Sequence, residues 1–245
     1  MRIAMWLRFD SKEMPKLKNP VMLVATSTSL QQYRALYSQA RELAKYMLTK
    51  LQFDRVATIH SSAFAPEILV REDGLGALPA CHVYLHRGRR DLLLLTGDSS
   101  PMDDQYEFTR VVLDFAKKSG VKELFSVGAR WSENPVSPFQ DPEINGFASS
   151  AAGAARLEEH GVKLIKSEPA PFFASIIVAL AGDYGMEGYK ISVDHGEPIP
   201  HARTVVRMLE VLGEMIGFEI DMADLKSRIV SPPSNRPSSE NNIYH

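Results

Sequence analysis

The chain has little cysteine: Cys81 is the single one among 245 residues. One thiol excludes an intrachain disulfide, and scarce cysteine is typical of proteins from a reducing compartment. Cys81 stands in a segment where apolar and polar residues alternate, as they do in a half-buried strand. We therefore interpret Cys81 as a small apolar residue packed in a strand rather than as a nucleophile.

Long hydrophobic runs and an excess of one charge are also lacking. The longest apolar runs, at residues 92–95 and 172–181, are too short to span a bilayer. Residues 1–9 lack the apolar stretch and the cleavage site of a signal peptide. The 28 basic residues balance 30 acidic ones, which does not suggest binding to nucleic acid or to anionic membranes. We expect a cytoplasmic protein without either partner.

Motifs of catalysis and of cofactor binding are scarce as well. Gly74-Leu75-Gly76 lacks the lysine and the helix of a phosphate-binding loop, and no Gly-x-Ser-x-Gly elbow occurs. His82 and His86 lie about 13 Å apart along a predicted strand, so they cannot share a metal ion. We interpret His195 and His201 as polar residues of a solvated turn, with convergence on a metal as the alternative. The sequence predicts no catalytic residue, cofactor or metal.

Apolar strands and amphipathic helices alternate along the rest of the chain. Residues 92–97 form a continuous apolar run, typical of a strand covered on both faces, and residues 30–51 carry the three-and-four spacing of a long helix. Residues 131–147 are rich in proline, glycine and acidic residues and predict a loop. Other strands are predicted at 20–25, 56–59, 81–85, 121–127, 163–165 and 189–193, and other helices around 108–116 and at 151–160, 172–184 and 201–216.

This alternation predicts one α/β domain with three layers, α/β/α, around a mixed or parallel sheet. The expected division of the chain is an N-terminal segment (1–18), the α/β domain (19–228), a Pro/Ser-rich flexible linker (229–242) and a C-terminal motif (243–245). The linker predicts disorder, because residues 231–242 have no apolar side chain whose burial could offset the entropy of ordering.

The last three residues form the first candidate site. Ile243 and Tyr244 follow the polar linker and have no core to join, and His245 carries the terminal carboxylate. An apolar and an aromatic side chain on such a tether are suited to a pocket on another molecule, where the carboxylate can also be captured. We predict that Ile243, Tyr244 and His245 bind a partner.

A second candidate site follows the apolar strand at 92–97. Asp98, Ser99 and Ser100 stand where a strand ends and a helix begins, the place where open α/β sheets bind ligands, and Gly128 ends a later strand. The alternative that we favour is that Asp98 to Ser100 cap a helix starting near Met102.

Several segments together resemble the PAC2 family, the proteasome assembly chaperone 2-like proteins. The resemblance covers roughly residues 19–225 and rests on the order and spacing of NPVMLV (19–24), LLLLTGDSSP (92–101), GVKELFSVG (120–128), RTVV (203–206) and GFEIDMADL (217–225). Two positions depart from the family pattern. Ala129 stands where a second glycine is frequent, and residues 171–174 read PFFA in place of a glycine-rich turn. The chain thus resembles a divergent member.

The resemblance implies a phosphorylase-like α/β fold and a non-catalytic function as a proteasome assembly chaperone or activator. Archaeal members of the family are homo-oligomers whose C-terminal hydrophobic-Tyr-X (HbYX) tails bind the α-ring of the 20S proteasome. The implied partners are therefore 20S α subunits and further copies of this chain, with Ile243, Tyr244 and His245 as docking residues. We also expect self-association through apolar surface on the helix at 201–216 and on the loop around Trp131.

Two alternatives remain at this point. One is a phosphorylase-like domain that binds or turns over a small phosphorylated or nucleoside-like ligand at the strand ends near Asp98 and Ser99. The other is a PAC2-like protein from a cell without a proteasome, in which the tail pattern is accidental. The presence of proteasome genes in the source organism separates the last alternative from the docking hypothesis.

Overall fold

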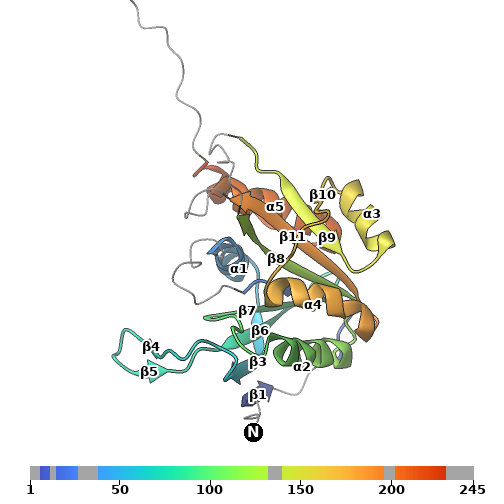
Figure 1. Cartoon of the computed structure of the whole chain (residues 1–245). Coiled ribbons are helices and arrows are strands. Elements are labelled where there is room, and N and C mark those ends of the chain that lie inside the picture. Colours follow the sequence, from blue (N-terminus) through green and yellow to red (C-terminus); the bar gives the residue numbers. More distant parts are fainter. Residues whose placement is uncertain (1–5, 12–14, 27–37, 132–139, 196–201, 230–245) are drawn as a thin grey trace, which may run out of the picture.

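The computed structural model describes residues 6–11, 15–26, 38–131, 140–195 and 202–229. Within them, nine strands form one mixed sheet in the order β1-β3-β6-β7-β2-β8-β11-β9-β10. The hairpin of β4 (Leu69–Val70) and β5 (Gly76–Ala77) projects from the body (Figure 1). The strands of the sheet are β1 (Leu7–Ser11), β2 (Val21–Val24), β3 (Asp54–Ser61), β6 (Cys81–His86), β7 (Leu92–Gly97), β8 (Glu123–Trp131), β9 (Ile144–Ala148), β10 (Lys163–Leu164) and β11 (Glu187–His195).

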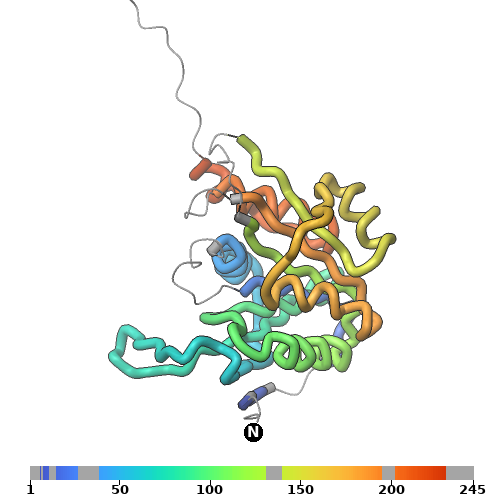
Figure 2. The backbone as a smooth tube through the Cα atoms, in the orientation of Figure 1, coloured from blue at the N-terminus to red at the C-terminus, as the bar shows by residue number. Residues whose placement is uncertain are grey.

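Helices cover both faces of the sheet, as the path of the backbone shows (Figure 2). One face packs against α1 (Ser38–Lys50), α3 (Ala151–Glu159) and α5 (Ala202–Ile216), and the other against α2 (Gln105–Lys118) and α4 (Phe173–Ala181). A 3-10 turn (Gly182–Tyr184) follows α4, and the short α6 (Ala223–Lys226) packs on α5. The predicted three-layer α/β/α class is confirmed. None of the helices in the described ranges has the length and apolar content to cross a membrane.

The four central strands, β7, β2, β8 and β11, all pair in parallel. Their carboxyl ends therefore meet at one edge of the sheet, here called the carboxyl edge, and their amino ends meet at the opposite amino edge. The register aligns Val24 of β2 with Leu95 of β7 and with Ser126 of β8, and Ser126 in turn with Lys190 of β11. Residues far apart in the sequence are thus brought to the same level.

The leucine run of β7 explains why this strand lies in the middle. Leu92 and Leu94 join the core under α1 and α5, whereas Leu93 and Leu95 join the core under α2 and α4. All four are at most 1% exposed. Burying one such side chain contributes about 1.5–3 kcal/mol, so both faces of this strand stabilise the fold. The prediction of a strand covered on both faces is confirmed.

Two strands of the large sheet were not predicted. Residues 144–147, assigned to a loop, belong to β9, which pairs antiparallel with β11. The loop prediction was wrong because Asn145 and Gly146 interrupt the apolar pattern, although Asn145 is buried and its carbonyl accepts a hydrogen bond from Ser192. In the N-terminal segment, β1 pairs antiparallel with β3 at the edge of the sheet. The first part of the predicted helix at 30–51 lies outside the described residues, and α1 is described from Ser38.

Candidate functional site

The predicted docking residues Ile243, Tyr244 and His245 lie outside the described residues, as do positions 230–242 of the linker. Their role stays a prediction from the sequence. His201, whose convergence with His195 on a metal ion was the alternative prediction, also lies outside the described residues. Within the described part of the chain, no three His, Cys, Asp or Glu side chains gather closely enough to hold a metal ion.

Asp98, Ser99 and Ser100 follow β7 at the carboxyl edge. The hydroxyl of Ser100 lies 3.2 Å from that of Thr26, which follows the neighbouring strand β2. The capping role that we favoured for Asp98 to Ser100 is wrong, because α2 begins only at Gln105. Its N-cap residue is Asp104, which has a φ of 43° and makes no side-chain capping bond. The intervening residues 98–104 instead lead the chain from the sheet to the helix.

Cys81 is fully buried in β6, and its interpretation as a packed residue is confirmed. Its Sγ donates a hydrogen bond to the carbonyl of Ser99 at 3.1 Å. Burial, assisted by the nearby charge of Asp98, raises the pKa of the thiol. A buried thiol with a raised pKa is unreactive at neutral pH, because the thiolate is the nucleophile.

The two histidines of β6 have separate partners. His82 Nδ1 lies 3.1 Å from Thr58 Oγ1, and His86 Nδ1 lies 2.9 Å from the carbonyl oxygen of Gln52. Burial lowers the pKa of His82, which favours the neutral ring. His82 therefore contacts β3, and His86 contacts the segment that leads into β3.

Gly128, the fourth predicted ligand-site residue, lies in β8 opposite Ser192 of β11. A Cβ atom at this position would come within 2.9 Å of Lys190 Nζ. Glycine therefore leaves the space that the lysine amine occupies above the strand. The sequence predicts that Gly128 ends its strand, but β8 continues to Trp131. The sequence also did not single out the lysine beside Gly128.

A cavity of about 440 Å³ opens at this end of β8 and β11. Its walls come from the ends of β8, β9 and β11, from the segment at 165–172 and from the first turn of α4, and most of its lining residues are apolar. A smaller cavity of about 50 Å³, which Ser100 and Thr26 line, lies beside it and shares Phe172 and Ala174 with it. Asp98 and Ser99 line neither of these two cavities.

Lys190 is the unusual residue of the large cavity. It is 7% exposed, and within the described residues no hydrogen bond or ion pair involves its amine. Burial lowers the pKa of Lys190 to about 7, because a buried ammonium group loses its hydration without gaining a compensating partner. The amine therefore changes between its charged and its neutral form near neutral pH.

Arg130, the other cation of this cavity, is fully paired. Its Nε and Nη2 donate to the two carboxylate oxygens of Asp194 at 2.7 and 2.8 Å, and its Nη1 donates to Glu168 at 2.6 Å. The hydrogen bonds to Asp194 raise the pKa of Arg130. Since two carboxylates neutralise this guanidinium, Arg130 forms a fixed wall of the cavity and Lys190 remains the cation without a counter-charge.

The first turn of α4 closes the cavity from above the sheet. Phe172 precedes the helix with a φ of 72°, and no side chain caps the helix start. Ser126 of β8 donates a hydrogen bond to the carbonyl of Ala174 at 2.6 Å, which ties this turn to the sheet. Because the amides of Phe173 and Ala174 have no partner within the helix, the positive end of α4 adds to the potential near Lys190.

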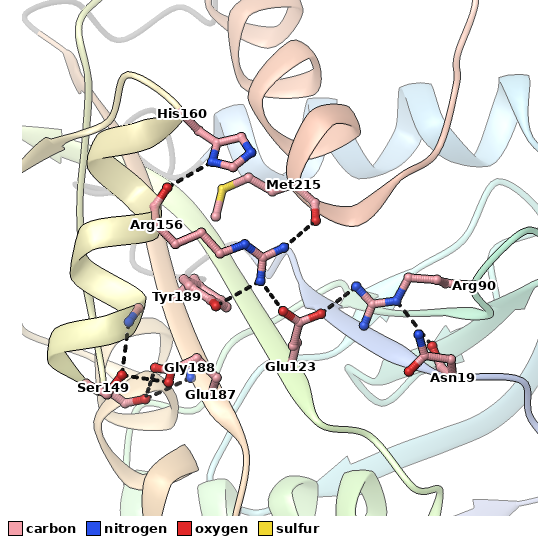
Figure 3. A network of polar contacts seen from close by, with 12 residues as sticks. Asn19, Arg90, Glu123, Ser149, Arg156, His160, Glu187, Gly188, Tyr189 and Met215 are labelled. Carbon is pink, nitrogen blue, oxygen red and sulfur yellow. Dashed lines mark hydrogen bonds and ion pairs between the residues drawn. The ribbon is translucent and has the colours of Figure 1, made fainter.

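The amino edge of the same strands carries a saturated polar network (Figure 3). Glu123, the first residue of β8, forms ion pairs with Arg90 and Arg156. Arg156 also donates to the hydroxyl of Tyr189 at 2.9 Å and to the carbonyl of Met215 at 2.7 Å. This network joins the turn before β7, α3 and α5 to β8 and β11, and each of its charges has a partner of opposite sign because Glu123 is shared by two arginines.

The apolar stripe of α5, predicted to support self-association, does not lie at the surface. The stripe on α5 is buried within the chain, with Met208 and Leu212 fully covered, so that part of the prediction is wrong. The loop after Trp131 lies outside the described residues. Exposed large apolar side chains gather instead on and beside the β4–β5 hairpin: Ile68, Val70, Leu75 and Leu78.

Lys190 is the residue that sequence reasoning missed, although a signal was present. The strand predicted at 189–193 reads YKISV, and a lysine is rarely buried in a central strand. A strand that is covered on both faces has no solvated side for a charge. A lysine at such a position marks a candidate for a buried charge.

Comparisons with known proteins agree on one family. The model of the PAC2 family matches residues 38–230. The fold is similar to that of PbaB, an archaeal proteasome activator from Pyrococcus furiosus, with a TM-score of 0.78 and 18% identity over 91% of this chain and 94% of the other. A proteasome-assembly chaperone homologue from Mycobacterium tuberculosis gives a TM-score of 0.71 and 18% identity over 85% and 90%. Among curated protein sequences, none matches this chain significantly.

Proposed function

The chain belongs to the PAC2 family, and from this premise we propose that it is a non-catalytic proteasome assembly chaperone or activator. In this proposal it binds the α-ring of the 20S proteasome through Ile243, Tyr244 and His245. The observation that carries the proposal is the coincidence of the family match with a hydrophobic-Tyr-X sequence at positions 243–245. The similar folds of an archaeal proteasome activator and of an assembly-chaperone homologue support it.

The chemistry of the tail suits a pocket between α subunits. The ring of Tyr244 offers a large apolar area and a hydroxyl that needs a partner. The carboxylate of His245 offers a charge-assisted hydrogen bond to a cationic side chain. Three residues bury little surface, so a single tail binds weakly. The proposal therefore includes a homo-oligomer, in which each tail after the first binds almost intramolecularly.

The linker and the hairpin support this arrangement. A segment of this length, from Arg228 to Asn242, would reach roughly 20 Å as a flexible coil, enough for several tails to find separate pockets. The exposed apolar residues of the β4–β5 hairpin, such as Val70 at 73% exposure, provide surface that a second copy could cover. Sedimentation at micromolar concentration should therefore give a species heavier than one chain, whereas a monomer would contradict the oligomeric part of the proposal.

Co-purification with 20S α-rings of the source organism tests the docking part. Tyr244→Ala should abolish binding, because it removes the aromatic anchor. One residue added after His245 should do nearly the same, because it moves the carboxylate out of register. His245→Ala is the matched control and should bind almost normally, since the pattern accepts any residue at this position. Circular dichroism should show an unchanged fold in all three variants. Wild-type binding by both Tyr244→Ala and the extended chain would refute docking through the tail.

A further inference from the structure

The cavity at the carboxyl edge contains a positive charge that its own chain leaves uncompensated. Lys190 enters it from β11, and Gly128 leaves room for the amine at the floor of the cavity. The amine has no hydrogen-bond or ion-pair partner within the described residues, and the residue is only 7% exposed. A buried ammonium group without a partner is destabilising, and an anion that pairs with it would relieve this cost.

The other charged groups of the cavity do not provide that counter-ion. Arg130 of β8 and Glu168 of the segment at 165–172 line the cavity, and Asp194 of β11 is bonded to Arg130. Both carboxylates are engaged with the guanidinium, and neither is in contact with Lys190. The strand β9 and the helix α4, which also form the walls, contain no ionisable side chain.

The remaining features indicate what kind of molecule would fit. The uncapped start of α4 adds the positive end of a helix dipole to the charge of Lys190, and this combination attracts an oxyanion. Phe147, Phe172 and Pro171 give the rest of the cavity an apolar lining. Its volume of about 440 Å³ lies within the usual range for small-molecule sites, well above the size of a single inorganic ion.

We propose that this cavity binds a small organic anion whose carboxylate or phosphate group pairs with Lys190 and the first-turn amides of α4, and whose apolar body lies against Phe147 and Phe172. The site stands on the geometry of the cavity and not on the docking tail. It is also distinct from the predicted site at Asp98 and Ser99, which do not line it. Binding here and binding to α-rings can therefore succeed or fail independently.

Thermal unfolding with two anionic probes and one neutral probe tests the proposal. Benzoate and phenyl phosphate share an aromatic body with benzamide, which carries no charge. At pH 6, either anion at millimolar concentration should raise the Tm of the full chain by roughly 2–4 °C or more, whereas benzamide should not. A response to one anion alone also supports the site and identifies the headgroup. No rise with either anion, or an equal rise with benzamide, overturns the proposal.

Two variants locate the binding. Lys190→Met keeps the length and apolar body of the side chain but removes the charge, and should weaken the binding of the active anion at least about tenfold. Gly128→Ala should also weaken it, because its methyl group would displace the amine. Lys163→Met is the matched control, since Lys163 is exposed and paired with Glu143 at the surface. Anion binding that is unchanged in both Lys190→Met and Gly128→Ala refutes the assignment.

The wild-type chain supplies a further readout that needs no variant. An anion binds the protonated amine, and Lys190 loses its proton near pH 7. The affinity measured by calorimetry should therefore fall about tenfold for each pH unit above 7. The affinity of Lys163→Met for the anion should depend on pH as that of the wild type does, whereas the affinity of Lys190→Met should not depend on pH in this range. An affinity for the anion that does not vary between pH 6 and 9 contradicts pairing with Lys190.

Discussion

At the amino edge of the sheet, Glu123 of β8 lies between Arg90 and Arg156, whereas at the carboxyl edge Lys190 of the adjacent strand has no charged partner within the described residues. Glu123 on β8 and Lys190 on β11 thus lie in opposite electrostatic environments. The protonated form of Lys190 carries a cost of about 4–5 kcal/mol, as its lowered pKa implies.

The contrast between the paired Glu123 and the unpaired Lys190 distinguishes a polar group that stabilises the fold from one that is suited to binding another molecule. A network in which every charge is met holds elements together and has little capacity left for another molecule. A single buried cation beside a cavity destabilises the free protein and is relieved when an anion binds. Three measurements can break or sharpen this contrast.

Removal of Glu123 should have the largest destabilising effect. Glu123→Ala leaves Arg90 and Arg156 facing each other with side chains only 17% and 30% exposed. The loss of their shared counter-charge should lower the free energy of unfolding by about 3 kcal/mol, measured by urea denaturation at pH 7. Glu143→Ala, which breaks the exposed pair with Lys163, is the control and should change stability by less than about 1 kcal/mol. Similar small effects of the two changes would show that the network is no stronger than a surface pair.

Lys190→Met should act in the opposite direction and depend on pH. Folded Lys190 loses its proton near pH 7 and the unfolded chain near pH 10.5, so between these values the unfolded state binds more protons and wild-type stability rises with pH. The variant lacks this contribution. It should exceed the wild type in unfolding free energy at pH 6, and its advantage should shrink by about 2–3 kcal/mol by pH 9.

Urea unfolding of both chains at pH 6, 7, 8 and 9 checks this expectation, because all other titrating groups are common to the two. Lys163→Met should run parallel to the wild type at every pH, since its amine is exposed. A difference between wild type and Lys190→Met that is the same at pH 6 and pH 9 would mean that the folded lysine titrates normally and is not buried as described.

A pair of glycine substitutions should give the smallest effects and compares the two ends directly. At the amino end of β11, Gly188→Ala would place a Cβ atom 2.5 Å from the carbonyl oxygen of Val178, so the backbone of α4 must shift, at a cost of about 2 kcal/mol. At the carboxyl end of β8, Gly128→Ala meets only the flexible end of Lys190 and should cost less than about 1 kcal/mol. Equal losses of Tm would indicate that the carboxyl edge is as tightly packed as the amino edge.

Much of the fold was predictable, and the reason is local. The apolar run at 92–97 and the spacing of apolar residues at 202–216 indicate which faces of a strand and of a helix are buried. The two can be told apart because the repeat of side-chain direction differs between a strand and a helix. The prediction failed where a strand lacks such a pattern. Residues 144–148 include Asn145 and Gly146, which have no strand preference, and they form β9 because β11 offers them a partner.

The candidate sites divide in the same way. Gly128 was predicted to end a strand, but β8 runs on to Trp131 because β11 pairs with it along its whole length. The predicted capping of α2 by Asp98 to Ser100 was wrong, because the chain runs on to Asp104 before the helix begins. The apolar stripe on α5 predicted the correct helix but the wrong surface, since periodicity identifies an apolar face without saying what covers it. The exposure of the apolar side chains on the β4–β5 hairpin follows from how the other elements pack, so the sequence alone did not predict it.

By itself, the sequence determined the α/β class and the order of most elements, because apolar residues recur with the period of the strand or helix that buries them. It also determined the family resemblance, which rests on the order and spacing of several short segments. It also provided the tail motif at 243–245, which is a property of three consecutive residues. Only the tertiary structure decided the environment of Lys190. A charge becomes unpaired and buried through what β8, β11, α4 and the segment at 165–172 place around it, and β9, α3 and β10 separate β8 from the other three along the chain. Desolvation and ion pairing depend on distance in space, and no local pattern records them.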